Sequence, residues 1–252
     1  MSRQIVNLQA TFARASNFPV AAPAVLRLYA PMNAPVTPAA RISRLHRGLR
    51  IHFENQPSPV AEFMAVRTLA PFRVLVATIL SARTKDQTTA AVSERLFKEV
   101  RGLDDLQRIS LPSLTELLYP VGFYRTKARM LKQLPGAVQT LFGGRIPDTI
   151  EELVQLPGVG RKTANLVVSE AFDKPGICVD VHVHRISNRL GLVRTRTPLE
   201  TEMTLRRILP KRFWKTWNRY LVAFGQTLCT PRKPRCAECP IRALCRRIGV
   251  RD

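Results

Sequence analysis

The first segment of the sequence that can do chemistry carries two glycines beside two basic residues. It reads Leu156-Pro157-Gly158-Val159-Gly160-Arg161-Lys162-Thr163-Ala164. Glycine permits backbone conformations and close approaches that a side chain forbids, and the free N–H groups at the start of a following helix attract anions. The segment therefore predicts a hairpin that binds phosphate through Gly158, Val159, Gly160 and Arg161. An ordinary helix–helix turn with glycine as a cap explains the same residues equally well.

Four cysteines near the C-terminus form a second group with chemical potential. Cys229, Cys236, Cys239 and Cys245 are separated by gaps of six, two and five residues. Four thiolates bind either zinc or an iron–sulfur cluster, and the single C-x-x-C hook weakly favours the cluster, because zinc sites commonly join two such hooks. Disulfides are the least favoured alternative, since no convincing secretory signal precedes the cysteines. The fifth cysteine, Cys178, is expected to be a buried apolar residue.

Three cations lie between the first two cysteines of this group. Arg232, Lys233 and Arg235 stand in a stretch with two prolines, which stiffen the backbone. Residues 229–252 as a whole carry a net charge of +5. We expect these three side chains to contact phosphates. Solvated side chains without a ligand are the alternative.

The composition points to a nucleic-acid partner. The chain has 252 residues with 40 Lys+Arg against 18 Asp+Glu, which gives a formal charge of +22. A charge this large attracts polyanions strongly and in a salt-dependent way. Hydrophobic residues make up 45% of the chain, enough for a real core, and no apolar run approaches the length of a membrane span. The low aromatic content of 7% argues weakly against a binder of single strands.

From about residue 42 onward, the sequence predicts an all-α protein made of short helices. Apolar residues recur at helical spacing, and no strand-like alternation stands out. Asp86 can cap a helix that runs to about Val100. Further helices are expected at 124–142, 149–156, 164–171, 181–190, 198–208 and 211–227.

The N-terminal segment differs from the rest of the chain. Residues 1–53 contain seven arginines, no lysine and no acidic residue, and the first 40 residues carry five prolines. We expect those 40 residues to be mostly disordered. Three explanations stay open: a dispensable extension or a start assigned too early, an organellar transit peptide, and a basic DNA-binding arm. The remainder of the chain still carries +15 without this segment.

The motifs together resemble one family. The glycine hairpin is followed, 18 residues after Lys162, by Asp180 in the stretch Val179-Asp180-Val181-His182-Val183-His184-Arg185, and then by the four cysteines. This combination resembles the helix-hairpin-helix DNA glycosylases of the endonuclease III family over about residues 43–248. The resemblance implies a [4Fe–4S] cluster at the cysteines, because their spacing matches that of the family loop.

The family fold implies two helical domains with the active site in the cleft between them. A helical barrel domain is expected at 64–174, with the hairpin at about 150–170. The cluster domain would combine 43–63 with 175–252, and residues 1–42 would form a basic extension.

The resemblance also assigns chemical roles. In the family the hairpin lysine is the nucleophile and the later aspartate assists it, so these roles are carried over to Lys162 and Asp180. A neutral amine can attack the sugar carbon C1′, and a carboxylate can stabilise the positive charge that develops on the sugar. A helix N-cap is the alternative role for Asp180, and both roles are compatible. His182 is expected to steady Asp180 or a phosphate, and His184 is expected to be structural.

One position departs from the family pattern. Leu80-Ser81-Ala82-Arg83-Thr84-Lys85-Asp86 lies where the family has a Leu-Ser-x-Gln-like helix entry, whose glutamine is expected to fill the gap left by the extruded base. Arg83 stands in its place. The guanidinium of Arg83 can occupy the gap in the base stack and hydrogen-bond the base left unpaired. We expect this change to shift the preferred lesion or the preferred opposite base. An exposed arginine at a helix start is the alternative. Trp214 and Trp217 are expected to face the core.

We therefore expect a bifunctional DNA glycosylase/AP lyase that excises oxidised pyrimidines from duplex DNA and nicks the strand by β-elimination. A monofunctional mismatch glycosylase of the same superfamily and a non-catalytic helix-hairpin-helix DNA-binding module are the alternatives. The expected partner is double-stranded DNA with damaged bases or abasic sites. We expect the protein to act as a monomer and not to associate with a membrane. The expected location is the cytoplasm or nucleoid of a bacterium, with an organellar transit role for residues 1–40 left open.

Overall fold

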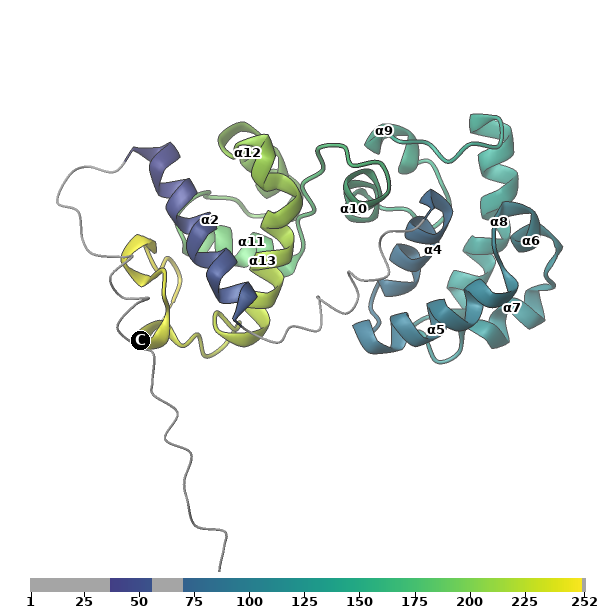
Figure 1. Cartoon of the computed structure of the whole chain (residues 1–252), viewed down its shortest axis with the longest axis horizontal. Helices are drawn as coiled ribbons and strands as arrows, with labels where there is room; N and C mark the ends of the chain where they lie inside the picture. Colours follow the sequence, from purple (N-terminus) through teal and green to yellow (C-terminus); the bar gives the residue numbers. More distant parts are fainter. Residues whose placement is uncertain (1–36, 56–69, 251–252) are drawn as a thin grey trace, which may run out of the picture. The chain divides into compact units, whose positions relative to one another are not determined.

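In the described part of the chain the regular secondary structure consists of helices, as the sequence predicts. The computed structural model describes residues 37–55 and 70–250, and no strand occurs among them (Figure 1). None of the helices in these two ranges is both long and apolar enough to cross a membrane. The helices are α2 (Pro38–Glu54), α4 (Pro71–Ser81), α5 (Asp86–Glu99), α6 (Leu103–Arg108), α7 (Leu111–Leu118), α8 (Tyr124–Phe142), α9 (Ile150–Leu153), α10 (Arg161–Ala171), α11 (Val181–Arg189), α12 (Pro198–Ile208) and α13 (Trp214–Thr227).

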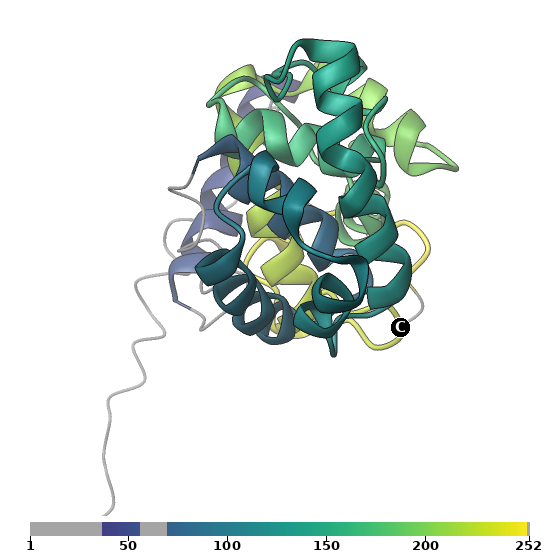
Figure 2. The same cartoon turned by 90° about the vertical axis from the view of Figure 1, so that its right-hand side faces the viewer.

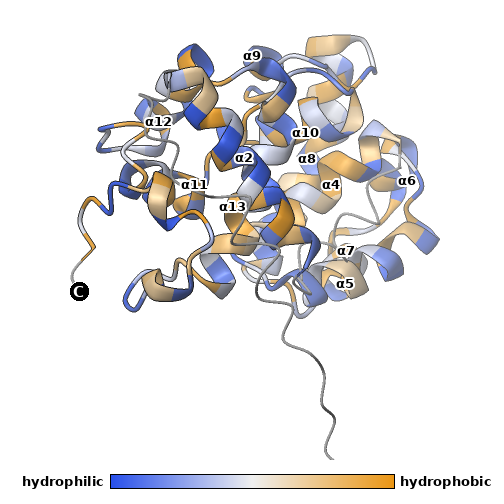
Figure 3. Ribbon diagram, turned by 60° about the vertical axis from the view of Figure 1, so that its left-hand side comes forward, coloured by the Kyte–Doolittle hydropathy of each residue, from blue (hydrophilic) through white to orange (hydrophobic). Residues whose placement is uncertain are grey.

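Helices α4–α10 share one hydrophobic core. Its buried residues all fall between Phe72 and Val168, within the range predicted for the barrel domain. Helix α4 packs against α10, α5 and α8, and these neighbours bury nearly every residue of its apolar run Val74–Leu80. This explains why α4 is mostly hydrophobic in Figure 3, since a helix that is covered all round needs no polar face. Figure 2 views this group of helices from another side.

A second group of helices packs around α13. Helix α13 contacts α2 and α11, and α11 also contacts α12. Trp217 is fully buried and Trp214 nearly so, as predicted. The indole N–H of Trp214 donates to the carbonyl of Leu209 at 3.0 Å, which satisfies the one polar atom of its ring. The predicted domain boundaries stay predictions, and residues 1–36 and 56–69 lie outside the described ranges.

Several helix ends differ from the prediction. Helix α10 begins at Arg161, before the predicted start at 164, and α9 ends at Leu153, before the predicted end at 156. Helix α2 begins at Pro38, before the predicted start near 42, because the hydroxyl of Thr37 accepts from Ala40 N at 3.3 Å and caps it. A further difference is a correction: Asp86 is the first residue of α5 and its cap is Lys85. The expected helix 211–227 consists of a 3-10 turn, Lys211–Phe213, followed by α13.

The contact between α2 and α13 predicts a fall of stability in acid. His46 Nε2 hydrogen-bonds Thr216 Oγ1 at 2.8 Å, and its ring stacks on Phe213. Burial, reinforced by the charges of Arg50 and Arg212, lowers the pKa of His46 from 6.5 to about 4. Between those two pH values the unfolded chain binds a proton that the folded chain does not, so stability falls as the pH drops through this window.

Urea unfolding of the wild-type chain and of His46→Gln, measured from pH 7 down to about pH 4.5, checks this expectation. The midpoint should fall less steeply for the variant, because glutamine binds no proton in this range. Identical slopes would show that His46 makes no contribution.

Candidate active site

The predicted hairpin forms between α9 and α10. The hydroxyl of Thr149 caps α9 by accepting from Glu152 N, and Val159 N donates to Leu156 O at 3.1 Å within the turn that follows. Gly158 has a φ of +78°, and a Cβ at this position would lie 3.2 Å from the sulfur of Met130. Glycine is required here both for its backbone conformation and for the close approach of α8.

The N-terminus of α10 is open towards solvent. Gly160 is its N-cap and provides no side-chain hydrogen bond, so the first N–H groups of the helix have no partner within it. A Cβ on Gly160 would have nothing within 4 Å, so the space beside this glycine is open. Lys162 lies in this first turn and is exposed. The arrangement fits the predicted phosphate-binding hairpin, with an accessible primary amine beside it.

Asp180 is the N-cap of α11, which confirms the capping role considered for it. Its Oδ1 accepts hydrogen bonds from His182 N and Val183 N, both at 2.9 Å. Both capping bonds use the same oxygen, so the cap engages only one of the two carboxylate oxygens. The side chain is partly exposed. A cap of this kind fixes the carboxylate on a rigid helix terminus and leaves room for a second role.

His182 lies close to both predicted catalytic groups. Burial is the main cause that lowers its pKa, the charge of Asp180 raises it, and the charges of Arg185 and Lys162 lower it. The amine and the carboxylate, from α10 and the start of α11, therefore both act electrostatically on one imidazole. His182 Nδ1 also contacts Arg185 Nη2 at 3.2 Å. The expectation that the His182 side chain steadies Asp180 or a phosphate stays a prediction.

A buried carboxylate joins the helix of Lys162 to α12. The side chain of Glu202 is only 5% exposed, and its two oxygens accept from Nε and Nη2 of Arg161, each at 3.0 Å. Arg206 Nε donates to the same carboxylate at 2.9 Å, and Arg206 Nη2 donates to Asn165 Oδ1 at 2.8 Å. The guanidinium of Arg161 is thus engaged with protein, and its predicted contact with DNA stays a prediction.

This network reaches the segment that leads to Asp180. Asn165 Oδ1 also accepts from Ile177 N at 3.1 Å, and Asn165 Nδ2 donates to Arg161 O. Ile177 and the intervening Cys178 are both buried, the latter as predicted. The backbone three residues before Asp180 is therefore fixed to the first turns of α10.

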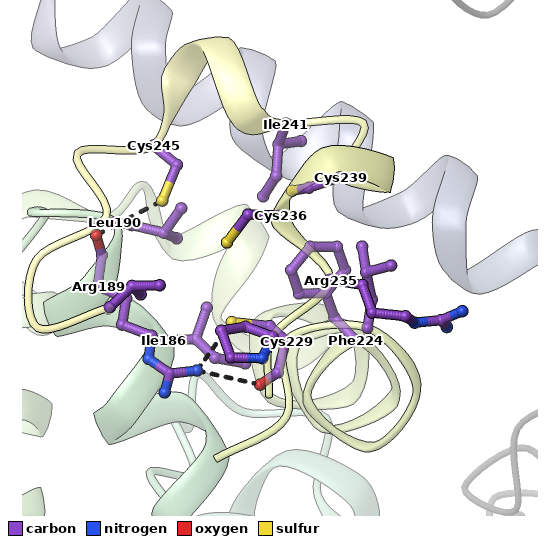
Figure 4. Close-up of a pocket in the computed structure, with 13 residues that line it drawn as sticks. Ile186, Arg189, Leu190, Phe224, Cys229, Arg235, Cys236, Cys239, Ile241 and Cys245 are labelled. Carbon is purple, nitrogen blue, oxygen red and sulfur yellow. Dashed lines mark hydrogen bonds between the residues drawn. The ribbon is translucent and has the colours of Figure 1, made fainter. Parts of the chain in front are cut away.

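The four C-terminal cysteines line one pocket (Figure 4). Ile186, Leu190, Phe224 and Ile241 supply apolar walls. Burial, with a further contribution from the neighbouring thiols, raises the pKa of Cys239 to about 12. Among the described residues, no three side chains of metal-binding type are grouped closely enough for a single ion. Four cysteines that line one pocket are the donor set that an iron–sulfur cluster takes.

Two arginines of α11 hold the cysteine segment. Arg189 Nη1 donates to Cys229 Sγ at 3.4 Å and to Thr230 O at 2.7 Å, and Arg185 Nη2 donates to Cys229 O at 3.0 Å. The backbone N–H of Arg247 approaches Cys245 Sγ at 3.4 Å. Donors to the sulfurs compensate negative charge, as the thiolates of such a site require.

The three cations predicted to contact phosphates in the cysteine segment differ in whether they are engaged within the protein. Arg232 and Lys233 are exposed. Arg235 is exposed too, but its guanidinium donates to Glu238 Oε2 at 3.0 Å and to Thr227 O at 2.7 Å. Arg235 is thus partly engaged within the protein, whereas the other two are placed to meet a ligand.

The site residues lie within segments that match known family profiles. The profile of the HhH-GPD superfamily base excision DNA repair proteins matches residues 76–211, and that of the iron–sulfur binding domain of endonuclease III matches residues 229–245. The chain is 46% identical to endonuclease III of Thermotoga maritima over 175 residues, which cover 69% of this chain and 82% of the relative. The chain belongs to the endonuclease III family. Its cofactor is a [4Fe–4S] cluster, with the four cysteines as the predicted ligands.

Solved structures of similar chains agree with this assignment. A non-covalent endonuclease III–DNA complex superposes with a TM-score of 0.72 at 36% identity, covering 82% of this chain and 94% of that chain. A trapped endonuclease III–DNA covalent intermediate, an estranged-adenine complex, gives a TM-score of 0.71 at 36% identity and covers 82% and 96%. These likenesses confirm the predicted helix-hairpin-helix glycosylase fold.

Several residues that shape the site were not identified from the sequence. Glu202 lies 40 positions beyond the hairpin lysine and appears in the sequence as one of many surface-like charges. Arg185 and Arg189 do carry a signal, because they lie four apart on α11 and so share one helix face. That spacing indicates a common direction but not the cysteine segment as the target.

Removal of the Glu202 charge should destabilise the fold. In Glu202→Gln, Arg161 and Arg206 would face each other without their shared carboxylate, and we expect a loss of about 2 to 3 kcal/mol in the free energy of unfolding, because both arginines are partly exposed. Denaturant titration measures this loss. Glu94→Gln is the matched control, because it breaks an exposed ion pair with Lys98 and should cost far less. Equal losses in the two variants would contradict this role of Glu202.

Proposed function

We propose that Lys162 and Asp180 are the catalytic pair of a DNA glycosylase/AP lyase that acts on oxidised pyrimidines in duplex DNA. The observation that carries the proposal is that Asn165, on the helix of Lys162, accepts a hydrogen bond at 3.1 Å from the backbone N–H of Ile177, three residues before Asp180. Family membership supplies the reaction class. An exposed amine in the first turn of α10 and a carboxylate anchored at the start of α11 are the two groups that this reaction needs.

The chemistry follows from the nature of these groups. The neutral amine of Lys162 attacks C1′ of the damaged nucleotide and the base departs, while the carboxylate of Asp180 stabilises the positive charge on the sugar. The amine then forms a Schiff base with the opened sugar. The Schiff base acidifies the neighbouring C2′ hydrogen, and loss of that proton expels the 3′ phosphate by β-elimination. Water then hydrolyses the Schiff base, which leaves an aldehyde on the sugar and frees the amine of Lys162. The products are a free base and a nicked strand.

The DNA-binding role rests on separate features. The open N-terminus of α10 and Gly160 offer N–H groups to one phosphate, and the charge of +22 favours association with any part of the duplex. Arg232 and Lys233 add exposed cations at the cysteine segment. In this proposal the cluster supports that surface and takes no part in the reaction steps. The cytoplasmic or nucleoid location stays a prediction.

Borohydride trapping tests the role of Lys162. The wild-type protein, incubated with a duplex that carries one oxidised thymine, should give a covalent protein–DNA complex on denaturing gels after borohydride, because the reductant converts the Schiff base to a stable amine. Lys162→Ala should give none, and Lys211→Ala, a lysine in the 3-10 turn before α13, should trap like the wild type.

The same gels separate the alternatives. Base release without a trapped complex would identify a monofunctional glycosylase, and binding without base release would identify a DNA-binding module. Trapping by Lys162→Ala would place the nucleophile on another residue.

Variants of Asp180 separate its cap from its charge. Asparagine can still accept at the helix terminus, so Asp180→Asn should keep the stability of the protein but lose about 100-fold or more in base excision. Asp180→Ala should also lose about 1 kcal/mol of stability, because the two capping bonds disappear. Thermal melting and single-turnover excision measure the two effects. Full activity of Asp180→Asn would exclude a role for the negative charge.

A further inference from the structure

Lys127 is a buried lysine that the proposed reaction does not use. It lies on α8 with 6% of its surface exposed. Its ammonium donates to Leu80 O at 2.7 Å, to Ala82 O at 2.6 Å and to Thr84 Oγ1 at 3.1 Å. An ammonium group has three N–H donors, so these three acceptors account for all of them. Burial lowers the pKa of Lys127 to about 8, which keeps the amine mainly protonated at neutral pH.

The acceptors of Lys127 lie in the last turn of α4 and in the turn that follows, which carries Arg83. This turn, residues 82–85, connects α4 to α5, and Arg83 has a φ of +54°, in the left-handed region that a side chain disfavours. Thr84 Oγ1 also accepts from Gly122 N at 3.1 Å. A Cβ at Gly122 would collide with the carbonyl oxygen of Arg83. Close packing beneath the turn therefore holds a strained backbone in place.

Above the turn, two side chains pair at the surface. The guanidinium carbon of Arg83 lies 5.5 Å from the ring centre of Phe123, within the range of a cation–π contact. Phe123 is 61% exposed and also has a left-handed backbone, with a φ of +58°. A large exposed ring beside an exposed guanidinium gives a flat cationic surface of the kind on which nucleic-acid bases stack.

Helix α8 lies next to both the Arg83 turn and the hairpin. Met130, one helical turn after Lys127, contacts Gly158 in the hairpin. Ile79 of α4 also borders Gly158, and the next residue, Leu80, supplies a carbonyl to Lys127. The hairpin and the Arg83 turn therefore rest on neighbouring residues of the same two helices.

We propose that Lys127 is a positioning residue that holds Arg83 and Phe123 as one stacking surface for duplex DNA when a nucleotide is extruded. The inference rests on the proposed function, because only an enzyme that flips a nucleotide leaves a gap in the duplex to be filled. Arg83 then acts as the side chain that meets the base left unpaired. Lys127 touches neither DNA nor the reacting atoms and acts through the turn.

The test compares duplex with single-stranded abasic DNA, because a single strand has no stack to be opened or filled. Lys127→Met keeps the length of the side chain and removes the donors. We expect its rate of strand cleavage to fall about 10- to 100-fold on the duplex and to stay within about twofold of the wild type on the single strand. Thr84→Val, which removes a shared acceptor, should show the same pattern to a smaller degree and serves if Lys127→Met does not fold.

Lys132→Met is the matched control. Lys132 lies on the same helix, and its ammonium donates to three carbonyl groups at the end of α6, those of Leu106, Gln107 and Ile109. Its loss removes a similar set of hydrogen bonds, none of which involves the Arg83 turn, so the duplex-to-single-strand ratio should stay at the wild-type value.

Two outcomes would overturn the role of Lys127: equal losses on both substrates in Lys127→Met, or an unchanged duplex rate. Absence of cleavage by the wild-type chain on either substrate would instead contradict the proposed function, so the two failures can be told apart.

Discussion

The geometry of the site depends on one buried carboxylate shared by two arginines. Glu202 binds Arg161 at the start of α10 and Arg206 on α12. Arg206 also donates to Asn165 Oδ1, which accepts from the backbone N–H of Ile177 as well. A lysine and an aspartate that come from separate helices can act on one sugar only if those helices are held at a fixed separation. Charge-assisted bonds with little exposure provide that rigidity better than flexible surface contacts.

Helix α11 connects this site to the cluster-binding segment. Its N-terminus is capped by Asp180, and its later turns carry Arg185 and Arg189, which hold the backbone and sulfur of Cys229. The cysteine segment thus has a structural connection to the proposed catalytic carboxylate through a single helix. Because Asp180 caps this helix, its position is fixed before any DNA binds.

Much of the fold could be predicted from periodicity and capping residues. The helix at 124–142 agrees with α8 to the residue, since its apolar stripe is long and its C-terminus is marked by Gly143 in a left-handed conformation. Asp86 was assigned as a cap because its side chain suits that position, yet the preceding Lys85 has the extended backbone of an N-cap. Such errors arise because helix ends depend on the neighbouring packing as well as on local preference.

The sequence by itself determined the chemistry that is available: a lysine beside two glycines, an aspartate that begins a helix, and four cysteines at a characteristic spacing. Each of these signals is local, because it depends on residue type and on separation along the chain. Only the tertiary structure decided that Arg161 is neutralised by Glu202 and that Lys127 lies beneath Arg83. Arg161 and Glu202 are 41 positions apart, and Lys127 and its acceptor Ala82 are 45 positions apart. The pairing of buried charges is set by how helices pack, which no local pattern records.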